Sequence, residues 1–358
     1  MGEAIKGRGS TGHPAGRFEL TVNEAVDDGW HGEPADEFVE PLPRTQVREE
    51  RARSIISRNR SPDISFSQSV NPYRGCEHGC SYCFARPSHA YLGLSPGLDF
   101  ETRIFAKTNA PELLRAELAK PGYRCSPIAL GINTDAYQPI ERRLQLTRRL
   151  IEVLAESRHP FTVITKNALV LRDLDLLQPL ARHNLVRVYL SVTTLENRLS
   201  AALEPRASAP HSRLRAIARL REAGVEVGAM FAPVIPWVND HELEALLQAV
   251  REAGATAAGY VLLRLPHEVS PLFRDWLQTH LPDRAAHVMS TIGQLRGGKD
   301  YDANFGTRMS GQGVYADLLA RRFALALKRL GFPPREENPM DCSLFRAPRT
   351  PSPQGELF

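Results

Sequence analysis

Three cysteines stand close together in the sequence. Cys76, Cys80 and Cys83 form a C-x3-C-x2-C array within NPYRGCEHGCSYCFAR, residues 71–86. Thiolates this close in sequence can face one small inorganic centre, but they cannot all pair with one another as disulfides. Three thiolates can bind three irons of a cubane [4Fe–4S] cluster and leave the fourth iron without a protein ligand. Gly75 and Gly79 precede the first two cysteines and let the backbone pass close to a bulky cluster without a Cβ clash.

The open iron defines the chemistry that we expect. S-adenosylmethionine (SAM) can chelate such an iron through its amino and carboxylate groups, and one electron then splits the sulfonium. A zinc site is the alternative, because His78 lies inside the loop as a candidate fourth ligand. Zinc sites usually pair two short ligand clusters that are a dozen or more residues apart. No second cluster exists here, since Cys125 and Cys342 are isolated in sequence, and we favour the iron–sulfur cluster.

Composition limits the compartment and the class of protein. The chain has 358 residues, 42% of them hydrophobic, which supports a sizeable core. Its five cysteines, three of them clustered, favour a reducing compartment over a disulfide scaffold. The N-terminus lacks the apolar region of a signal peptide, and no run reaches the roughly eighteen apolar residues that span a membrane. We therefore expect a cytoplasmic protein that does not enter the membrane. The formal net charge of +4 is compatible with a polyanionic partner and also with none.

From Ile64 onward, β-rich runs alternate with amphipathic helical stretches. The predicted strands are Ile64–Val70, Ile128–Ile132, Phe161–Thr165, Val186–Val192, Val225–Phe231 and Ala257–Leu263. The predicted helices between them cover about 82–92, 110–120, 141–157, 172–182, 212–223 and 240–253. Near-continuous apolar strands that alternate with helices indicate parallel strands joined by right-handed crossovers. We predict an α/β fold, a partial (βα)6 TIM-like barrel over residues 63–285.

Two extensions flank this core in the predicted domain organisation. In the N-terminal extension, residues 1–62, the first 40 residues read as a loosely ordered arm docked through Phe18 and Trp30. Its basic end, Pro41–Arg60, is either a solvated helix face or a contact for phosphates. The C-terminal extension, residues 286–358, is predicted to be helical, with two helices at about 284–296 and 314–330 that flank a glycine-rich loop, GGKDYDANFGTRMSGQG, and with a flexible tail.

Polar side chains follow the predicted strands at their C-terminal ends, where functional groups of a parallel barrel collect. The cysteine loop follows the first strand. The residues at or just after the ends of the other strands are Asn133, Thr134, Asp135, Ala136 and Tyr137; Thr165, Lys166 and Asn167; Ser191, Thr193 and Thr194, with Glu204 and Arg206 a little later; and Phe231, Ala232 and Pro233. Because these sets converge on the same end as the cysteines, we expect one site there.

These motifs resemble the radical-SAM superfamily signature. The order CxxxCxYC, (S/T)-D, T-K, Ser and A-P is similar to spore photoproduct lyase and to its uncharacterised bacterial relatives, over residues 64–275. The resemblance implies that the three cysteines hold the cluster. It implies a SAM pocket lined by Phe84, Thr134, Lys166, Ser191 and Ala232. The superfamily's frequent GGE motif is absent, so Asp135 is the candidate for the amino-group contact, and Arg206 is a further cofactor-binding candidate.

The sequence departs from the lyase at its hydrogen-return relay. Ile132 stands at the relay cysteine position and Phe84 follows the last cluster cysteine, so only Tyr82 remains of the flanking tyrosines. Neither Ile nor Phe donates a readily abstracted hydrogen, and thymine-dimer reversal by the lyase's own relay is not expected. Tyr82 and Tyr137 are the candidate catalytic residues. Packing of Tyr137 against the following helix is the alternative.

The resemblance implies a radical-SAM enzyme that cleaves SAM reductively to a 5′-deoxyadenosyl radical. We favour a nucleic-acid substrate, a DNA lesion or modified base. A peptide or tRNA substrate is the alternative, and a non-catalytic metal-binding module for nucleic acid is the alternative of another class. The expected partner is a one-electron donor of flavodoxin or ferredoxin type. The last residues, Gln354–Phe358, resemble the Q-L-x-L-F peptide that binds the bacterial sliding clamp, with Gly355 in place of the usual Leu.

Overall fold

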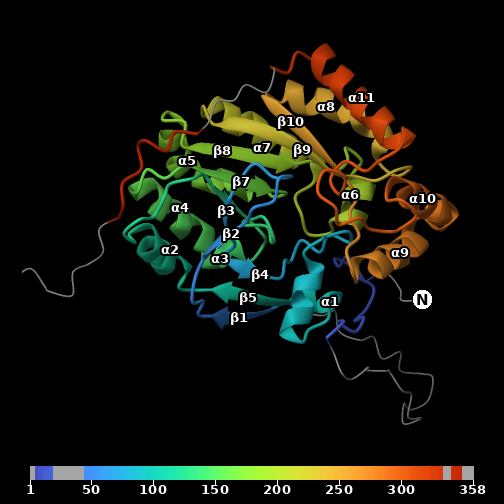
Figure 1. The fold of residues 1–358 in the computed structure, drawn as a ribbon, viewed down its shortest axis with the longest axis horizontal. Coiled ribbons are helices and arrows are strands. Elements are labelled where there is room, and N and C mark those ends of the chain that lie inside the picture. The colour runs from blue at the N-terminus through green and yellow to red at the C-terminus, as the bar shows by residue number, and fades with distance from the viewer. Residues whose placement is uncertain (1–4, 19–43, 334–339, 349–358) are drawn as a thin grey trace, which may run out of the picture.

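A curved, mainly parallel sheet forms the centre of the fold (Figure 1). The computed structural model describes residues 5–18, 44–333 and 340–348. The seven strands, in spatial order, are β10 (Ala257–Leu262), β9 (Glu226–Val234), β8 (Val186–Ser191), β7 (Phe161–Thr165), β6 (Ile128–Leu130), β3 (Gln68–Val70) and β2 (Ile56–Arg58). All neighbours pair in parallel except β2, which is antiparallel to β3. The six predicted parallel strands and the partial-barrel fold are therefore confirmed.

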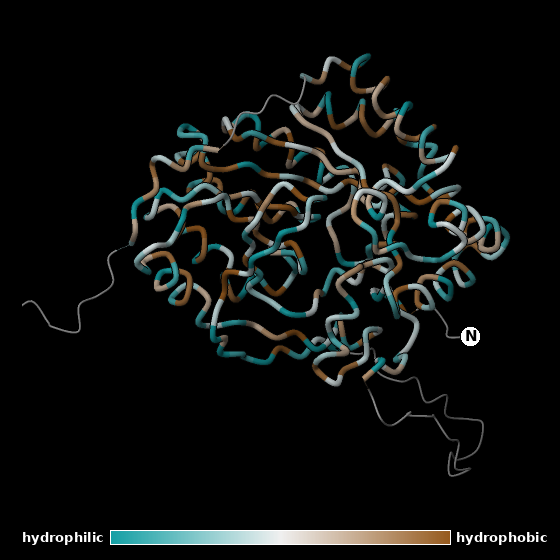
Figure 2. The backbone as a smooth tube through the Cα atoms, viewed as in Figure 1, coloured by the Kyte–Doolittle hydropathy of each residue, from teal (hydrophilic) through white to brown (hydrophobic). Residues whose placement is uncertain are grey.

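Helices follow the strands and cover the outer side of the sheet (Figure 1). They are α2 (Ala110–Leu118), α3 (Glu141–Leu144), α4 (Leu146–Glu156), η2 (Ala168–Asp173), α5 (Leu174–Ala181), α7 (Pro210–Glu222), η3 (Asp240–Glu242) and α8 (Leu243–Glu252). Helix α6 (Asn197–Leu203) packs instead in a separate apolar cluster with Cys80 and Tyr82. Successive side chains of a strand point to opposite faces of the sheet, and one of these faces forms the core between the sheet and the helices. In β7, Phe161 and Val163 are fully buried in the main apolar cluster, whereas Thr162 and Ile164, which alternate with them, are only half-buried. Figure 2 shows the resulting hydrophobic segments inside the molecule.

Part of the basic segment forms a strand of a second sheet, so its interpretation as a helix face is wrong. Three strands pair in the order β1 (Gln46–Glu50), β5 (Arg103–Lys107) and β4 (Tyr73–Arg74), with β1 parallel to β5. Val47 packs against a small apolar cluster that contains Tyr73 and Ile104. The strand forms because residues 57 positions away supply its hydrogen-bonding partner, as in the pair Gln46–Arg103. Local charge patterning does not reveal such a partner.

Other boundaries also differ from the prediction. The first core strand begins only at Gln68, and residues 86–92 form a 3-10 helix, η1 (Arg86–Leu92), followed by α1 (Leu98–Thr102). Helix α9 (Val269–His280) was not predicted; it buries Phe273 and Trp276. The two predicted C-terminal helices are present as α10 (Pro282–Leu295) and α11 (Val314–Arg329). Within the described residues no helix is long and apolar enough to cross a membrane.

The glycine-rich loop between α10 and α11 connects the two open sides of the barrel. On one side, the carbonyl of Met309 accepts a hydrogen bond from the backbone N–H of Leu262 at the end of β10, at 2.9 Å. On the other side, Arg308 pairs with Asp63 in the connection between β2 and β3, and Gly306 donates to the same carboxylate at 2.7 Å. The loop therefore partly closes the gap that a six-stranded parallel barrel leaves.

Both ends of the described chain pack on the core. In the N-terminal arm, the carbonyl of Gly12 accepts the N–H of Leu98 at 3.1 Å. The predicted anchor Phe18 lies 4.9 Å from Tyr91, but both rings are exposed, and Trp30 lies outside the described residues. In the C-terminal segment, Phe345 packs on the His159 ring at 5.2 Å. This docking brings Cys342 beside Cys125. Burial and the neighbouring Cys342 thiol, which is hydrogen-bonded to it, raise the pKa of Cys125. The two cysteines that are isolated in sequence are thus neighbours in space.

Candidate active site

The three clustered cysteines lie on the loop between β4 and η1, after the first pair of core strands. Cys76 and Cys80 are buried, and Cys83 is half-buried. Gly75 and Gly79 have φ values of +77° and +66°, in the left-handed region that favours glycine. A Cβ on Gly79 would approach a carboxylate oxygen of Glu101 to 2.7 Å. Glycine is therefore required at position 79 by the path of the loop and by the close packing of Glu101 against it.

Arg86 holds the cysteine loop in place and is fully buried. Its guanidinium donates hydrogen bonds to four backbone carbonyls, those of Cys80 at 2.9 Å, Gly97 at 2.9 Å, Pro96 at 3.1 Å and Gly79 at 3.2 Å. It also pairs at 2.5 Å with Glu101, whose side chain is equally buried. The other carboxylate oxygen of Glu101 accepts the N–H of Gly9 from the N-terminal arm at 3.0 Å. This buried ion pair was not identified from the sequence.

Backbone N–H groups lie beside two of the three thiols. Burial raises the pKa of Cys83, while Arg86 and the backbone N–H groups of Ala85 and Arg86 oppose the rise. Burial also raises the pKa of Cys76, whose sulfur accepts a backbone hydrogen bond from Asp135. Backbone hydrogen bonds to the sulfurs are among the factors that set the potential of an iron–sulfur cluster. The donor set and its N–H contacts therefore fit such a cluster.

A single-ion site fits this geometry less well. Among the described residues, no group of three or more His, Cys, Asp or Glu side chains is arranged to hold one metal ion. A zinc ion needs four ligands at about 2.0–2.3 Å, whereas a cluster distributes its thiolates over separate irons. His78, the candidate fourth zinc ligand, has its Nδ1 3.3 Å from Asp135 and its Nε2 3.2 Å from Asn167. Both ring nitrogens of His78 are thus engaged elsewhere.

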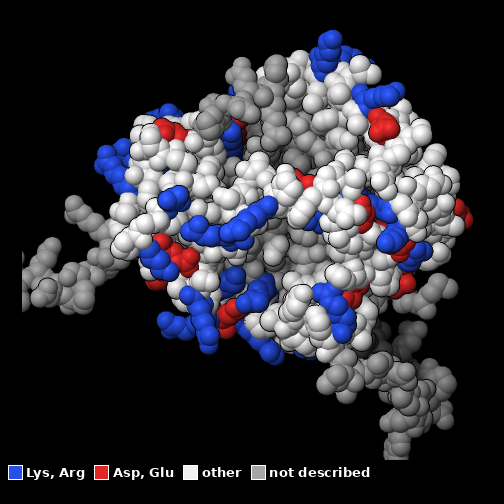
Figure 3. Space-filling model, viewed as in Figure 1, with Lys and Arg blue, Asp and Glu red and all other residues white. Residues whose placement is uncertain are grey.

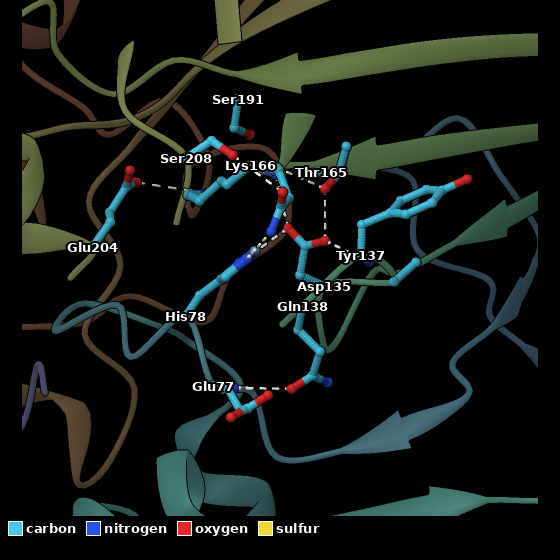
Figure 4. Close-up of polar contacts among 12 residues, drawn as sticks. Glu77, His78, Asp135, Tyr137, Gln138, Thr165, Lys166, Ser191, Glu204 and Ser208 are labelled. Carbon is cyan, nitrogen blue, oxygen red and sulfur yellow. Dashed lines mark hydrogen bonds and ion pairs between the residues drawn. The ribbon is translucent and has the colours of Figure 1, made fainter. Parts of the chain in front are cut away.

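Asp135 organises the ends of the second and third core strands (Figure 4). Its carboxylate accepts hydrogen bonds from the Thr165 hydroxyl at 2.6 Å, the Lys166 backbone N–H at 2.7 Å and the Tyr137 backbone N–H at 2.8 Å. Burial alone would raise the pKa of Asp135, but His78 and these hydrogen bonds lower it to about 2. Both oxygens already have partners from the protein. The predicted amino-group contact to SAM would have to compete with them.

Glu204 is a second buried centre that the sequence analysis noted only as a polar residue. Its carboxylate accepts hydrogen bonds from the hydroxyls of Tyr82 and Thr193 and pairs with Arg213. The Lys166 ammonium lies 4.0 Å from it, and 5.8 Å from the centre of the Tyr82 ring. Burial would raise the pKa of Glu204, but Arg213 and Lys166 reverse the shift and lower it. The carboxylate therefore holds Lys166 and Tyr82 together beside Cys80.

The remaining candidates for the SAM pocket differ in their exposure. Ser191, at the end of β8, is 3% exposed, and Ala232 in β9 is half-buried and precedes a cis peptide bond to Pro233. Thr134 is buried, and its hydroxyl donates to the carbonyl of Tyr73 at 3.1 Å. Phe84 is 42% exposed and has the Arg264 guanidinium 5.4 Å from its ring centre.

Arg206 contacts the cysteine loop through Glu77. Its guanidinium pairs with Glu77 at 3.2 Å and donates to the Thr45 hydroxyl at 3.3 Å. It borders an open polar pocket of about 330 Å³ that is lined by Pro139, Arg142, Asn167, Arg206, Ala207 and Ser208.

Gln138 connects the cysteine loop to the segment that follows the second core strand. Its side chain accepts the N–H of Glu77 at 2.9 Å and donates to the carbonyl of Gly75 at 3.1 Å.

Tyr137 has the surroundings of a core residue. It is fully buried, and its hydroxyl donates to Asp173 at 3.0 Å. In Figure 4 its ring points away from the group formed by Asp135, His78 and Lys166. The geometry favours the packing role over hydrogen donation. Tyr82, in contrast, lies within the cysteine loop and next to Glu204.

Residues 70–250, about half of the chain, match the family model of the radical SAM superfamily, and the chain therefore belongs to that superfamily. Its members are enzymes that use a [4Fe–4S] cluster and SAM, and the cysteine loop is the part of this chain that fits the cluster.

Relatives extend the comparison without assigning a reaction. Uncharacterised proteins of Mycobacterium tuberculosis and Mycobacterium bovis are 39% identical over 222 residues, which are 62% of this chain and 65% of theirs. An uncharacterised protein of Methanocaldococcus jannaschii is 27% identical over 65% of this chain and 83% of its own length. The matched part of the chain thus spans less than two thirds of the mycobacterial proteins.

Solved structures of spore photoproduct lyase share the fold. One, complexed with dinucleoside spore photoproduct, has a TM-score of 0.55, with 79% of each chain covered at 17% identity. A point mutant of the same enzyme has a TM-score of 0.56, with the same coverage and identity. At this level of identity the similarity shows the fold alone. The resemblance predicted from the motifs is confirmed at the level of the superfamily and of this structural neighbour.

Proposed function

We propose that this protein is a radical SAM enzyme that removes a hydrogen atom from a nucleic-acid substrate, a DNA lesion or modified base. When bound, the cluster supplies the electron that splits SAM, and SAM supplies the 5′-deoxyadenosyl radical. Cys76, Cys80 and Cys83 are the proposed cluster ligands. The observation that carries the proposal is that these thiols lie at the same end of the sheet as Lys166 and Glu204, where a cofactor would meet a fixed cation.

Each residue has a role that its contacts support. Lys166 is the proposed partner of the SAM carboxylate, because its ammonium is only loosely paired with Glu204, at 4.0 Å. A charge-assisted bond to a carboxylate would then use an already oriented cation. Glu204 positions Lys166, and Ser191 and Ala232 are proposed to line the pocket beyond it. Arg206 and Asp135 hold the cysteine loop and the strand ends, which fixes the distance between cluster and pocket.

A nucleic-acid substrate is supported by the exposed ring at the edge of the site. Phe84 follows the last cluster cysteine and is 42% exposed, with the Arg264 guanidinium beside it. Aromatic rings and guanidinium planes stack on nucleobases with little dependence on base identity. The lyase that shares this fold was solved with a dinucleoside bound. Both points favour a base over a peptide at this edge.

The hydrogen chemistry must differ from the lyase's own relay. Ile132 and Phe84 offer no readily abstracted hydrogen at the two relay positions. Tyr82 is the proposed donor, because its hydroxyl is held by Glu204 inside the site. Loss of a hydrogen atom would leave a tyrosyl radical on Tyr82, which one electron from the reductant and one proton would return to tyrosine. Superfamily members also need a reductant, and we propose a flavodoxin- or ferredoxin-type protein in that role.

Anaerobic reconstitution with iron and sulfide, followed by measurement of 5′-deoxyadenosine, tests the proposal. Irradiated or alkylated duplex DNA should stimulate 5′-deoxyadenosine formation above the level with undamaged DNA, peptides or tRNA. The Cys80→Ala variant is the control for cluster-dependent cleavage. Stimulation by tRNA or peptide alone would reject the DNA substrate, and no 5′-deoxyadenosine from a fully loaded protein would reject the enzyme.

The sliding clamp remains a proposed partner through Gln354–Phe358, which lie outside the described residues. A clamp contact would bring the enzyme to DNA. A peptide of residues 347–358 should bind purified clamp with a Kd of about 1 μM. Replacement of Leu357 and Phe358 by Ala should abolish that binding, and no association of the wild-type peptide would remove the partner.

A further inference from the structure

The segment of residues 44–60 carries six arginines that the active site does not use. Arg44, Arg48, Arg51, Arg53, Arg58 and Arg60 are all exposed, and we call them the basic strip. The segment also contains two glutamates, so its formal charge is +4, which equals the net charge of the whole chain. All of the protein's net positive charge is therefore concentrated in these 17 residues.

The strip is not neutralised by neighbouring carboxylates. Within the described part of the chain, none of its six guanidiniums forms an ion pair at 4.0 Å or less. Of the two glutamates in the segment, Glu50 is already paired with Arg74 at 2.9 Å. Exposed arginines that only keep a protein soluble need neither clustering nor the absence of counter-charges. Their arrangement points to an anionic partner.

The backbone of the strip is fixed by the adjacent helix, so that the arginines stand on a rigid support. Asn109 bonds both the N–H and the carbonyl of Ala52, at 3.0 and 2.9 Å. Glu117 of α2 accepts the N–H groups of Ile55 at 2.7 Å and of Ile56 at 3.2 Å. Prior ordering of the backbone lowers the entropy that binding would otherwise lose.

Strand alternation places Arg48 of the strip in one row with Arg74, which is paired with Glu50. In the three-stranded sheet, Arg48 of β1 and Arg74 of β4 flank Phe105 of β5 in one row, whereas Val47 and Ile104 face the apolar cluster. Figure 3 shows basic side chains gathered over β2 and around β1 and β5 on this face of the molecule.

The strip begins directly beside the cysteine loop. The hydroxyl of Thr45 accepts a hydrogen bond from Arg206, and the same guanidinium pairs with Glu77 inside the loop. Arg74 at the end of β4 is two residues before Cys76. A strand of nucleic acid that follows the arginines therefore leads to the proposed cluster.

We propose that the basic strip binds the phosphate backbone of the nucleic acid next to the nucleotide that reacts. This inference rests on the proposed function for its substrate class. Arginine pairs with phosphate through two parallel hydrogen bonds and orients the strand without reading its sequence. The strip would supply affinity and register, while the pocket beside Phe84 and Lys166 would select the base.

Salt-dependent DNA binding tests the strip. The full-length protein is titrated with a fluorescein-labelled duplex of about 20 base pairs by anisotropy, at several salt concentrations between about 50 and 200 mM. The test variant combines Arg48→Gln, Arg51→Gln and Arg53→Gln. The matched control combines Arg215→Gln, Arg321→Gln and Arg329→Gln, three exposed arginines of α7 and α11, so both variants lose the same net charge.

The slope of log K against log salt should be less negative by about 3 in the test variant, because each lost phosphate contact reduces the magnitude of the slope by about 0.9. Its affinity at the lowest salt should fall at least about tenfold. The control should keep the wild-type slope. Equal slopes for all three proteins, or an equal loss in both variants, would overturn the inference.

A short substrate separates this inference from the proposed function. A modified nucleoside carries no phosphate for the strip to bind, so the test variant should form 5′-deoxyadenosine from it at the wild-type rate while losing duplex binding. Iron content and far-UV circular dichroism should match the wild type. Strip-dependent duplex binding without turnover of any nucleic acid would instead reject the proposed function. If the wild-type protein binds no duplex at low salt, the inference about the basic strip is overturned.

Discussion

Replacement of Arg86 by Met should loosen the cysteine loop more than any other single change outside the cysteines. The substitution keeps an unbranched side chain but removes the guanidinium, which leaves the fully buried Glu101 carboxylate, among the described residues, with the Gly9 N–H as its one remaining hydrogen-bond donor. Breaking a buried pair on one side costs about 3–5 kcal/mol, because the remaining charge stays out of water. That is a large fraction of a typical stability of about 5–15 kcal/mol.

Urea unfolding of the cluster-free protein measures this loss. With an m value of about 3 kcal/mol/M, the midpoint should fall by about 1–1.7 M. The double variant Arg86→Met, Glu101→Leu is the matched test, since removal of both charges leaves no uncompensated ion. It should be less destabilised than Arg86→Met alone. The reasoning would be refuted by a single variant that loses less than about 1 kcal/mol, or by a double variant that is the less stable of the two.

Three further predictions concern the cluster, the cofactor and pH. Cys80→Ala should abolish iron binding, whereas Cys342→Ala should retain full iron content by metal analysis. Lys166→Ala should keep the cluster but weaken SAM binding by about 1.5–3 kcal/mol in calorimetry; unchanged affinity would remove Lys166 from the pocket. Burial lowers the pKa of His159 to about 4, so only the unfolded state takes up the proton between about pH 6.5 and 4. Stability should fall by about 3 kcal/mol over that range as pH decreases. His159→Gln should remove this part of the pH dependence, and the exposed-residue control His211→Gln should not.

The sequence determined the features that depend on local spacing. The three cysteines within eight residues specify a cluster loop because ligands so near in the chain need no long-range contact to converge. The six parallel strands were predicted because strand and helix periodicities repeat along the chain. Phe161–Thr165 was predicted to the residue, since its apolar run is bounded by Pro160 and Lys166.

Only the tertiary structure decided the contacts between distant segments. Glu204 becomes a centre for Tyr82, Lys166 and Arg213 because three separate parts of the chain meet at one strand end. Such convergence carries no periodic signal, since a lone glutamate after a strand is more often solvated. Strand β1 likewise formed where charge suggested a helix face, because its partner β5 lies 57 residues away. Local patterns specify elements and short ligand arrays, whereas buried ion pairs depend on which surfaces the fold brings together.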